Sequence, residues 1–257
     1  KKAVYYLGNS AIMLFSCGVV LCVITLMFLE PLLRFFGSPN NVLDYAKTYT
    51  GIIAFGFPFL ILTTGGGHLI RADGRPNVSM VCNLTGAILN TFLDALFVFG
   101  LNMGMRGAAL ATIIGQVLSA IMVIWCLSHC KTVSVGKEHL RVRKKIISRI
   151  ISLGTAPFSN QLAMMVVQIV MNKSLKYYGS ISVYGEAVPI ACAGIITKVN
   201  QVFMSFVIGI SQGLQPITSF NYGAKKYKRV KTAYTFAIKC GFALAVVAFL
   251  LFQLAPR

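Results

Sequence analysis

The chain has 257 residues, of which 56% are hydrophobic and only 12% are charged, and its mean hydropathy is +0.75. Soluble domains carry about 25% charged residues, so this composition excludes an ordinary water-soluble protein. The 24 Lys and Arg residues against 6 Asp and Glu residues give a net charge of +18. In a membrane protein this excess of cations suits anionic lipid headgroups rather than nucleic acid.

The start of the chain shows no sign of a signal peptide, and the cysteines show no metal-binding pattern. The chain begins at Lys1 without a methionine, and no short apolar run with a cleavage site follows, so we expect no signal peptide and interpret the chain as a fragment. The cysteines show no C-x-x-C and no zinc-type spacing with histidine, so we expect reduced, small hydrophobic residues. They are Cys17, Cys22, Cys82, Cys126, Cys130, Cys192 and Cys240.

Seven stretches are long and apolar enough to cross a membrane. A helix of about 20 apolar residues spans the hydrocarbon layer and satisfies its own backbone hydrogen bonds there. The predicted spans are 11–29, 48–70, 78–101, 107–127, 150–172, 187–215 and 232–254. Pro58 and Pro157 each remove one backbone hydrogen bond from a span and permit a kink. The sequence therefore predicts an all-α, polytopic membrane protein.

The connections between spans differ in charge, and this difference predicts the orientation. Lys and Arg are retained on the cytoplasmic side of a membrane. Most of the cations fall in alternate connections, at 1–2, 71–75, 131–149 and 225–231. We therefore place these connections in the cytoplasm, which puts the two ends of the chain on opposite faces.

The longest connection, 129–149, reads HCKTVSVGKEHLRVRKKIISR and separates four spans from three. We predict that 1–128 belong to an N-terminal transmembrane lobe, that 129–149 form a basic cytoplasmic linker, and that 150–257 belong to a C-terminal lobe. The cations of the linker are expected to contact lipid headgroups.

Two shorter connections and several small residues carry local signals. RADGRPN, 71–77, predicts a tight reversal that makes the second and third spans antiparallel neighbours. YGAKKYKRVK, 222–231, is compatible with a short interfacial helix. Small residues such as Ala111 and Gly115 favour close helix packing, for which no functional role is required.

Asp94 is the only acid well inside a predicted span. An ionisable group at membrane depth is costly, so it should face a cavity or a partner. Asn90 lies four residues earlier on the same helical face, and Thr112 on the next helix could add a hydroxyl oxygen. These oxygens suit a hard cation such as Na⁺, which would compete with protonation of the carboxylate. The residues alone leave open a structural Asp94 that hydrogen-bonds Asn90.

A second polar cluster is predicted in the sixth span, where Lys198 lies near Asn200 and Gln201. The lysine either pairs with an acid from another helix or extends its amine to the interface. Gly209–Gly213 match the G-x-S-x-G pattern, but they lie within a span, and the chain has no P-loop or H-E-x-x-H motif. We therefore expect no enzyme, and no cofactor other than a bound Na⁺.

Three segments resemble the multidrug and toxic compound extrusion (MATE) family, in a bacterial member. They are IRADGRPN at 70–77, LNTFLDALFVFGLNMGMRGAALATIIGQ at 89–116 and GISQGLQPITSFNYGAKKYKRV at 209–230. The resemblance implies twelve helices in two six-helix lobes. The seven spans would then correspond to the third through ninth helices, and the basic linker to the connection between lobes.

The resemblance also implies a function. MATE transporters export organic cations and amphipathic drugs across the bacterial inner membrane by rocking of the two lobes, coupled to inward Na⁺ or H⁺. Similar transporters use an Asn and an Asp on the fifth helix and a Thr on the sixth, which fall on Asn90, Asp94 and Thr112. The family's acid on the first helix has no counterpart here, and the fifth span carries amides where some relatives carry an acid. More of the expected function therefore rests on Asp94.

Two alternatives stay open from the sequence. A flippase for lipid-linked precursors would need a cavity lined with cations for pyrophosphate, and Lys198 is the one obvious inward candidate. A membrane scaffold or enzyme subunit would transport nothing. For the preferred antiporter, the expected partners are a small organic cation or drug, Na⁺ or H⁺, and membrane lipids, with no nucleic acid.

Overall fold

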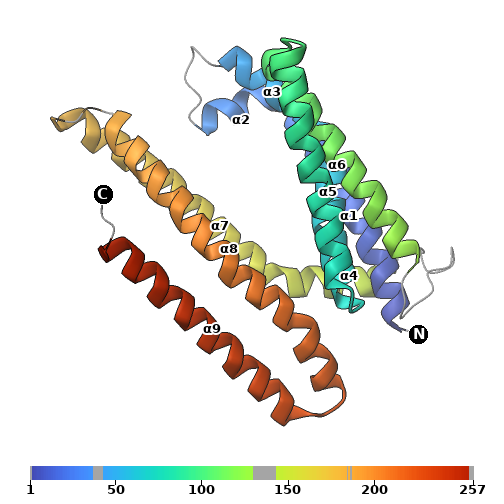
Figure 1. The fold of residues 1–257 in the computed structure, drawn as a ribbon. Coiled ribbons are helices and arrows are strands. Elements are labelled where there is room, and N and C mark those ends of the chain that lie inside the picture. Colours follow the sequence, from blue (N-terminus) through green and yellow to red (C-terminus); the bar gives the residue numbers. More distant parts are fainter. Residues whose placement is uncertain (1, 37–42, 130–142, 184, 186, 255–257) are drawn as a thin grey trace. The chain divides into compact units, whose positions relative to one another are not determined.

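The computed structural model describes residues 2–36, 43–129, 143–183, 185 and 187–254, and every regular element in these ranges is helical (Figure 1). This confirms the predicted all-α class. The elements are α1 (Lys2–Met27), α2 (Leu29–Phe35), α3 (Leu43–Ala54), α4 (Phe57–Ala72), α5 (Pro76–Ala95), the π-helical turn η2 (Leu96–Gly100), α6 (Gly104–Ser128), α7 (Lys144–Ile181), α8 (Ala187–Gly223) and α9 (Tyr227–Leu254).

Six of the described helices are long and apolar enough to cross a bilayer, and the bent pair α3 and α4 counts as a seventh if its two helices form one span. These elements follow the order of the seven predicted spans. Several helices extend beyond their predicted ends; α1, for example, begins at Lys2 and α7 runs on to Ile181. The extra turns contain more polar side chains than the predicted spans, such as Asn9 and Ser10 in α1 and Lys173 and Lys176 in α7.

The chain forms two compact units, Lys1–Ala156 and Pro157–Arg257. The first contains α1 to α6 and the start of α7, and within it α4 packs against α1, α5 and α6. The second contains the rest of α7 together with α8 and α9, which pack against each other. The predicted lobe limits stay predictions, and 130–142 of the predicted linker lie outside the described residues.

The second predicted span is broken. Its two helices meet at an angle of 56°, and Pro58 lies in the first turn of α4. At the break the Gly56 N–H donates to the Ile53 carbonyl, 2.7 Å away, three residues back rather than four. Proline is tolerated at a helix start because its missing N–H has no partner there. The chain therefore bends just before Pro58, where the sequence permits a kink, whereas α7 continues through Pro157.

Helices α5 and α6 approach each other closely at Gly86 and Gly115. A Cβ atom on Gly86 would lie 2.6 Å from the Gly115 carbonyl oxygen, and one on Gly115 would lie 2.7 Å from the Gly86 carbonyl oxygen. Beside this crossing, Ser119 donates a hydrogen bond to the Cys82 carbonyl at 3.0 Å. The small residues thus bring two backbones into contact, as expected for helices packed in lipid.

A buried ion pair secures the predicted reversal between α4 and α5. Arg75 Nε lies 2.8 Å from Asp73 Oδ2, and Arg75 Nη2 donates to the Cys126 carbonyl at 2.9 Å. Gly74 between them has a φ of 80°, a conformation that glycine adopts without strain. The reversal is confirmed, and Arg75 ties it to the last turns of α6. In Figure 1 this turn lies at the same end of the first unit as the start of α1.

The connection between α8 and α9 differs from the sequence expectation. Residues 222–231 do not form a separate interfacial helix, because α8 continues to Gly223 and α9 begins at Tyr227. The residues between the two helices form a turn, in which Lys225 has a φ of 58°. The cations Lys228, Arg229 and Lys231 therefore belong to the first turns of α9.

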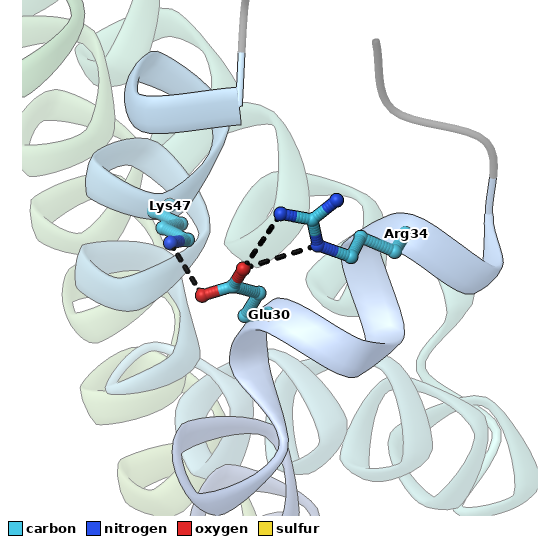
Figure 2. A network of polar contacts seen from close by, with 3 residues as sticks. All are labelled: Glu30, Arg34 and Lys47. Carbon is cyan, nitrogen blue, oxygen red and sulfur yellow. Dashed lines mark hydrogen bonds and ion pairs between the residues drawn. The ribbon is translucent and has the colours of Figure 1, made fainter. Parts of the chain in front are cut away.

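In the first unit, at the end opposite the turn between α4 and α5, Glu30 of α2 forms an ion pair with Lys47 of α3 (Figure 2). Its Oε2 accepts from Lys47 Nζ at 2.6 Å, and its Oε1 accepts from Arg34 Nε at 3.0 Å and from Arg34 Nη2 at 2.9 Å. The hydrogen bond from Lys47, followed by that from Arg34, holds the pKa of the Glu30 carboxyl below its ordinary value of 4.5. All three side chains are substantially exposed, so water weakens the pairs.

Replacing Glu30 with glutamine is expected to lower the thermal stability slightly at neutral pH and not at all in strong acid. A carboxyl group with a lowered folded-state pKa stabilises the fold above its unfolded pKa, and this contribution disappears as the pH falls through the folded value. The melting temperatures of wild type and Glu30→Gln in detergent should therefore converge below pH 4.5. Asp44→Asn, at an exposed acid of the neighbouring α3, is the control. A constant difference at all pH values would contradict the ion-pair interpretation.

Candidate functional site

A polar cavity of about 230 Å³ lies between α4, α5 and α6. Most of the side chains around it carry a hydroxyl or an amide, which is unusual for the interior of such an apolar chain. The lining residues are Leu60, Thr63 and Thr64 from α4, Asn83, Gly86, Ala87 and Asn90 from α5, and Thr112, Gly115, Gln116 and Ser119 from α6.

The spacing of these residues explains why they meet. Thr112, Gln116 and Ser119 are separated by four and three positions, so they share one face of α6. Asn83 and Asn90 are separated by seven positions, or about two turns of α5. The predicted site rested on Asn90, Asp94 and Thr112, and the polar stripe of α6 is a second signal in the sequence for the residues around this cavity.

Two of the predicted site residues are in contact. The Asn90 side-chain amide, Nδ2, donates to Thr112 Oγ1 at 3.4 Å, and that hydroxyl donates its own proton to the Ala108 carbonyl at 2.9 Å. A hydroxyl has one proton and two lone pairs. Because the Thr112 proton is already engaged, any further ligand of this oxygen must be a donor or a cation.

Asp94 lies one helical turn beyond Asn90, close to the end of α5. Its Oδ1 is buried and has no hydrogen-bond partner in the part of the chain that the structure describes. The π-helical turn η2 begins two residues later, at Leu96. Such turns are rare and occur frequently at functional sites. Asp94 is not among the residues that line the cavity, and within the described ranges no hydrogen bond joins it to Asn90 or Thr112.

Thr63 and Gln116 are two site candidates that the sequence analysis missed. Thr63 Oγ1 and Gln116 Oε1 are buried and, within the described ranges, also lack hydrogen-bond partners. The Gln116 amide lies against the break between α3 and α4, where a Cβ atom on Gly56 would collide with it. A buried acceptor without a donor costs about 1–3 kcal/mol, so these oxygens favour a ligand that satisfies them.

The predicted second cluster lies on α8 in the second unit. Lys198, Asn200 and Gln201 are all exposed there, and along the described length of α8 no recorded hydrogen bond joins them. Helical periodicity puts Lys198 and Gln201 on one face and Asn200 on another. Their role stays a prediction.

A metal centre built from several charged or soft ligands is absent from the described residues, since no group of three His, Cys, Asp or Glu side chains gathers there. A cation near Asp94 would therefore be coordinated by one carboxylate together with amide and hydroxyl oxygens. Such oxygen ligands suit hard cations rather than zinc.

Comparison with known proteins gives a consistent result. The family model described as MatE matches residues 1–96 and 158–256, well over half of the chain. The multidrug export protein MepA of Staphylococcus aureus (strain N315) is 27% identical over 236 residues, which cover 91% of this chain and 51% of that protein. MepA of Staphylococcus haemolyticus (strain JCSC1435) is 27% identical over 230 residues, with coverages of 89% and 49%. The chain thus spans about half the length of these curated relatives.

Solved structures show the same fold. A MOP superfamily transporter from Pyrococcus furiosus superposes with a TM-score of 0.84 at 22% identity, covering 97% of this chain and 55% of that one. An outward-facing multidrug resistance MATE family transporter superposes with a TM-score of 0.82, also at 22% identity, with coverages of 97% and 60%. These similarities extend over both units of the chain.

Proposed function

Because this chain belongs to the MatE family, we propose that the complete protein exports organic cations and amphipathic drugs in exchange for inward Na⁺ or H⁺. Membership of a transporter family confirms two sequence predictions, namely that the protein is a multi-pass membrane protein and that it is not an enzyme. The predicted bacterial membrane location agrees with the staphylococcal relatives.

One observation carries the proposal: Asp94 has a buried carboxylate oxygen without a hydrogen-bond partner among the described residues, and it lies one helical turn from Asn90, which lines the polar cavity. A carboxylate in such surroundings is stabilised either by taking up a proton or by binding a cation. Both events neutralise the same charge. The two ions would therefore compete for Asp94, and either can serve as the coupling ion.

The neighbouring residues support a cation as well as a proton. Asn90 and Thr112 are already joined by a hydrogen bond, and the Thr112 oxygen has its proton engaged elsewhere. A Na⁺ ion at Asp94 would be held by the carboxylate, with the Asn90 and Thr112 oxygens as further ligands. Thr63 and Gln116 add two more oxygens around the cavity that lack hydrogen-bond partners among the described residues, and these suit the N–H donors or positive charge of an organic cation.

Coupling requires that the ion and the drug favour different conformations. An ion shifts a conformational equilibrium only by the difference between its affinities for the two states. In the proposed cycle, an ion from outside occupies Asp94 and favours the state that releases drug. The flippase alternative would need cations around this cavity, and none of its lining residues is charged.

Dye efflux from proteoliposomes tests the proposal. Proteoliposomes that contain the full-length protein are loaded with a fluorescent organic cation. They are then exposed to an inward Na⁺ gradient or an inward H⁺ gradient in separate experiments. We expect at least one gradient to accelerate dye exit, and an ionophore that collapses this gradient should abolish the acceleration. Dye-exit rates that are the same with and without each gradient would overturn the proposal and favour a non-transporting scaffold.

A further inference from the structure

A second cavity, of about 500 Å³, lies at the basic end of the first unit, where the start of α7 meets α1. Its lining, as far as the described residues go, combines three cations, two phenols and one apolar side chain, with no acid. These residues are Tyr5 and Tyr6 from α1, Arg143, which directly precedes α7, and Lys145, Ile146 and Arg149 from α7. The transport proposal does not use this cavity.

A buried amide fixes the two walls of this cavity. Asn9 is only 1% exposed, and its Oδ1 accepts a hydrogen bond from the Arg143 backbone N–H at 2.9 Å. Its Nδ2 donates to the Tyr5 carbonyl at 2.8 Å. Since a buried polar side chain is tolerated only when it is hydrogen-bonded, Asn9 specifies how Arg143 sits beside α1.

The side chain of Arg143 is positioned by an aromatic ring. Its guanidinium carbon lies 3.6 Å from the centre of the Tyr5 ring, within the range of a cation–π contact. A guanidinium held in this way has a restricted orientation, and the planar group matches the oxygens of a phosphate. Lys145 and Arg149 add two further cations to the same cavity, and they lie four positions apart along α7, so they share a helical face.

The cavity lies at the depth of lipid headgroups. Tyr5 and Tyr6 are among the first residues of the span Val4–Met27. Tyrosine is enriched at this level of the membrane because its ring is apolar and its hydroxyl is polar. Phosphate groups of the lipids occupy the same level, and Ile146 supplies an apolar contact beside the cations.

We propose that this cavity binds the phosphate group of an anionic phospholipid. Its three cations supply positive charge, and its phenols can donate hydrogen bonds to phosphate oxygens. The bound headgroup would contact α1 and α7 together. Because α7 continues from the first unit into the second, this lipid would stabilise the start of a helix that both units share.

Lipid binding to the full-length protein in detergent, measured by native mass spectrometry with phosphatidylglycerol and with phosphatidylcholine, tests the proposal. We expect a clear preference of the wild type for phosphatidylglycerol. The double variant Lys145→Gln/Arg149→Gln should bind phosphatidylglycerol about 25-fold more weakly, since each interfacial cation contributes roughly fivefold. Its affinity for phosphatidylcholine should stay unchanged, and Arg149→Lys should retain most of the binding.

The control variant Lys225→Gln/Lys226→Gln removes the same charge from the turn between α8 and α9. It should bind phosphatidylglycerol within about twofold of wild type, because surface cations away from a site contribute little. An equal loss in the control, or no loss in the Lys145→Gln/Arg149→Gln variant, would overturn the proposal. Displacement of phosphatidylglycerol by millimolar inorganic phosphate would overturn the lipid assignment in favour of a soluble phosphate ligand. Melting temperatures measured without lipid establish that each variant is folded.

Discussion

Replacing Asp94 with asparagine is expected to abolish ion-driven efflux while leaving the amount of folded protein close to wild type. Asparagine has nearly the same shape, but it neither carries a charge nor exchanges a proton near neutral pH. The buried Oδ1 of Asp94 has no hydrogen-bond partner among the described residues that the substitution would break. Coupling free energies between two sites are about 1–3 kcal/mol. Without the Asp94 carboxylate this coupling is lost, so the ratio of dye-exit rates with and without the gradient should fall to about one.

The matched control is Asp44→Asn, which removes an acid from the exposed first turn of α3. This variant should retain the wild-type ratio in the same proteoliposome assay. Wild-type, gradient-dependent exit by Asp94→Asn would defeat the assignment of Asp94 as the coupling carboxylate. It would leave the family membership of the chain untouched.

Replacing Gly86 with alanine is expected to destabilise the first unit strongly. The added Cβ would lie 2.6 Å from the carbonyl oxygen of Gly115, and a backbone atom cannot move away by changing a rotamer. Overpacking of this kind costs about 1–3 kcal/mol. We expect a lower melting temperature in detergent and a lower yield of monodisperse protein.

Gly86→Ala should also weaken coupling, because separation of α5 from α6 would stretch the 3.4 Å hydrogen bond between Asn90 and Thr112. Gly51→Ala provides the control. Its added Cβ would meet a Leu29 methyl group at 3.6 Å, an ordinary van der Waals contact. A melting temperature for Gly86→Ala as high as that of Gly51→Ala would show that the two helices tolerate a wider separation.

The spans and the tight reversal were predictable because their signals are local. A span requires a run of apolar residues, and the reversal requires Asp73, Gly74 and Arg75 in consecutive positions. The break between α3 and α4 was partly predictable from Pro58. The absence of an interfacial helix at 222–231 was not predictable, because cations occur both at the ends of spanning helices and on interfacial helices.

The sequence by itself determined that this is a helical membrane protein with one acid deep in a span, and it placed Asn90 on the same face, because hydropathy and helical periodicity are properties of single segments. Only the tertiary structure decided which residues surround the cavity. Thr63 and Gln116 come from α4 and α6, two helices that pack against each other, and the Asn9 contact to Arg143 joins residues far apart in the chain. Such contacts depend on how helices approach one another in three dimensions, which no local pattern specifies.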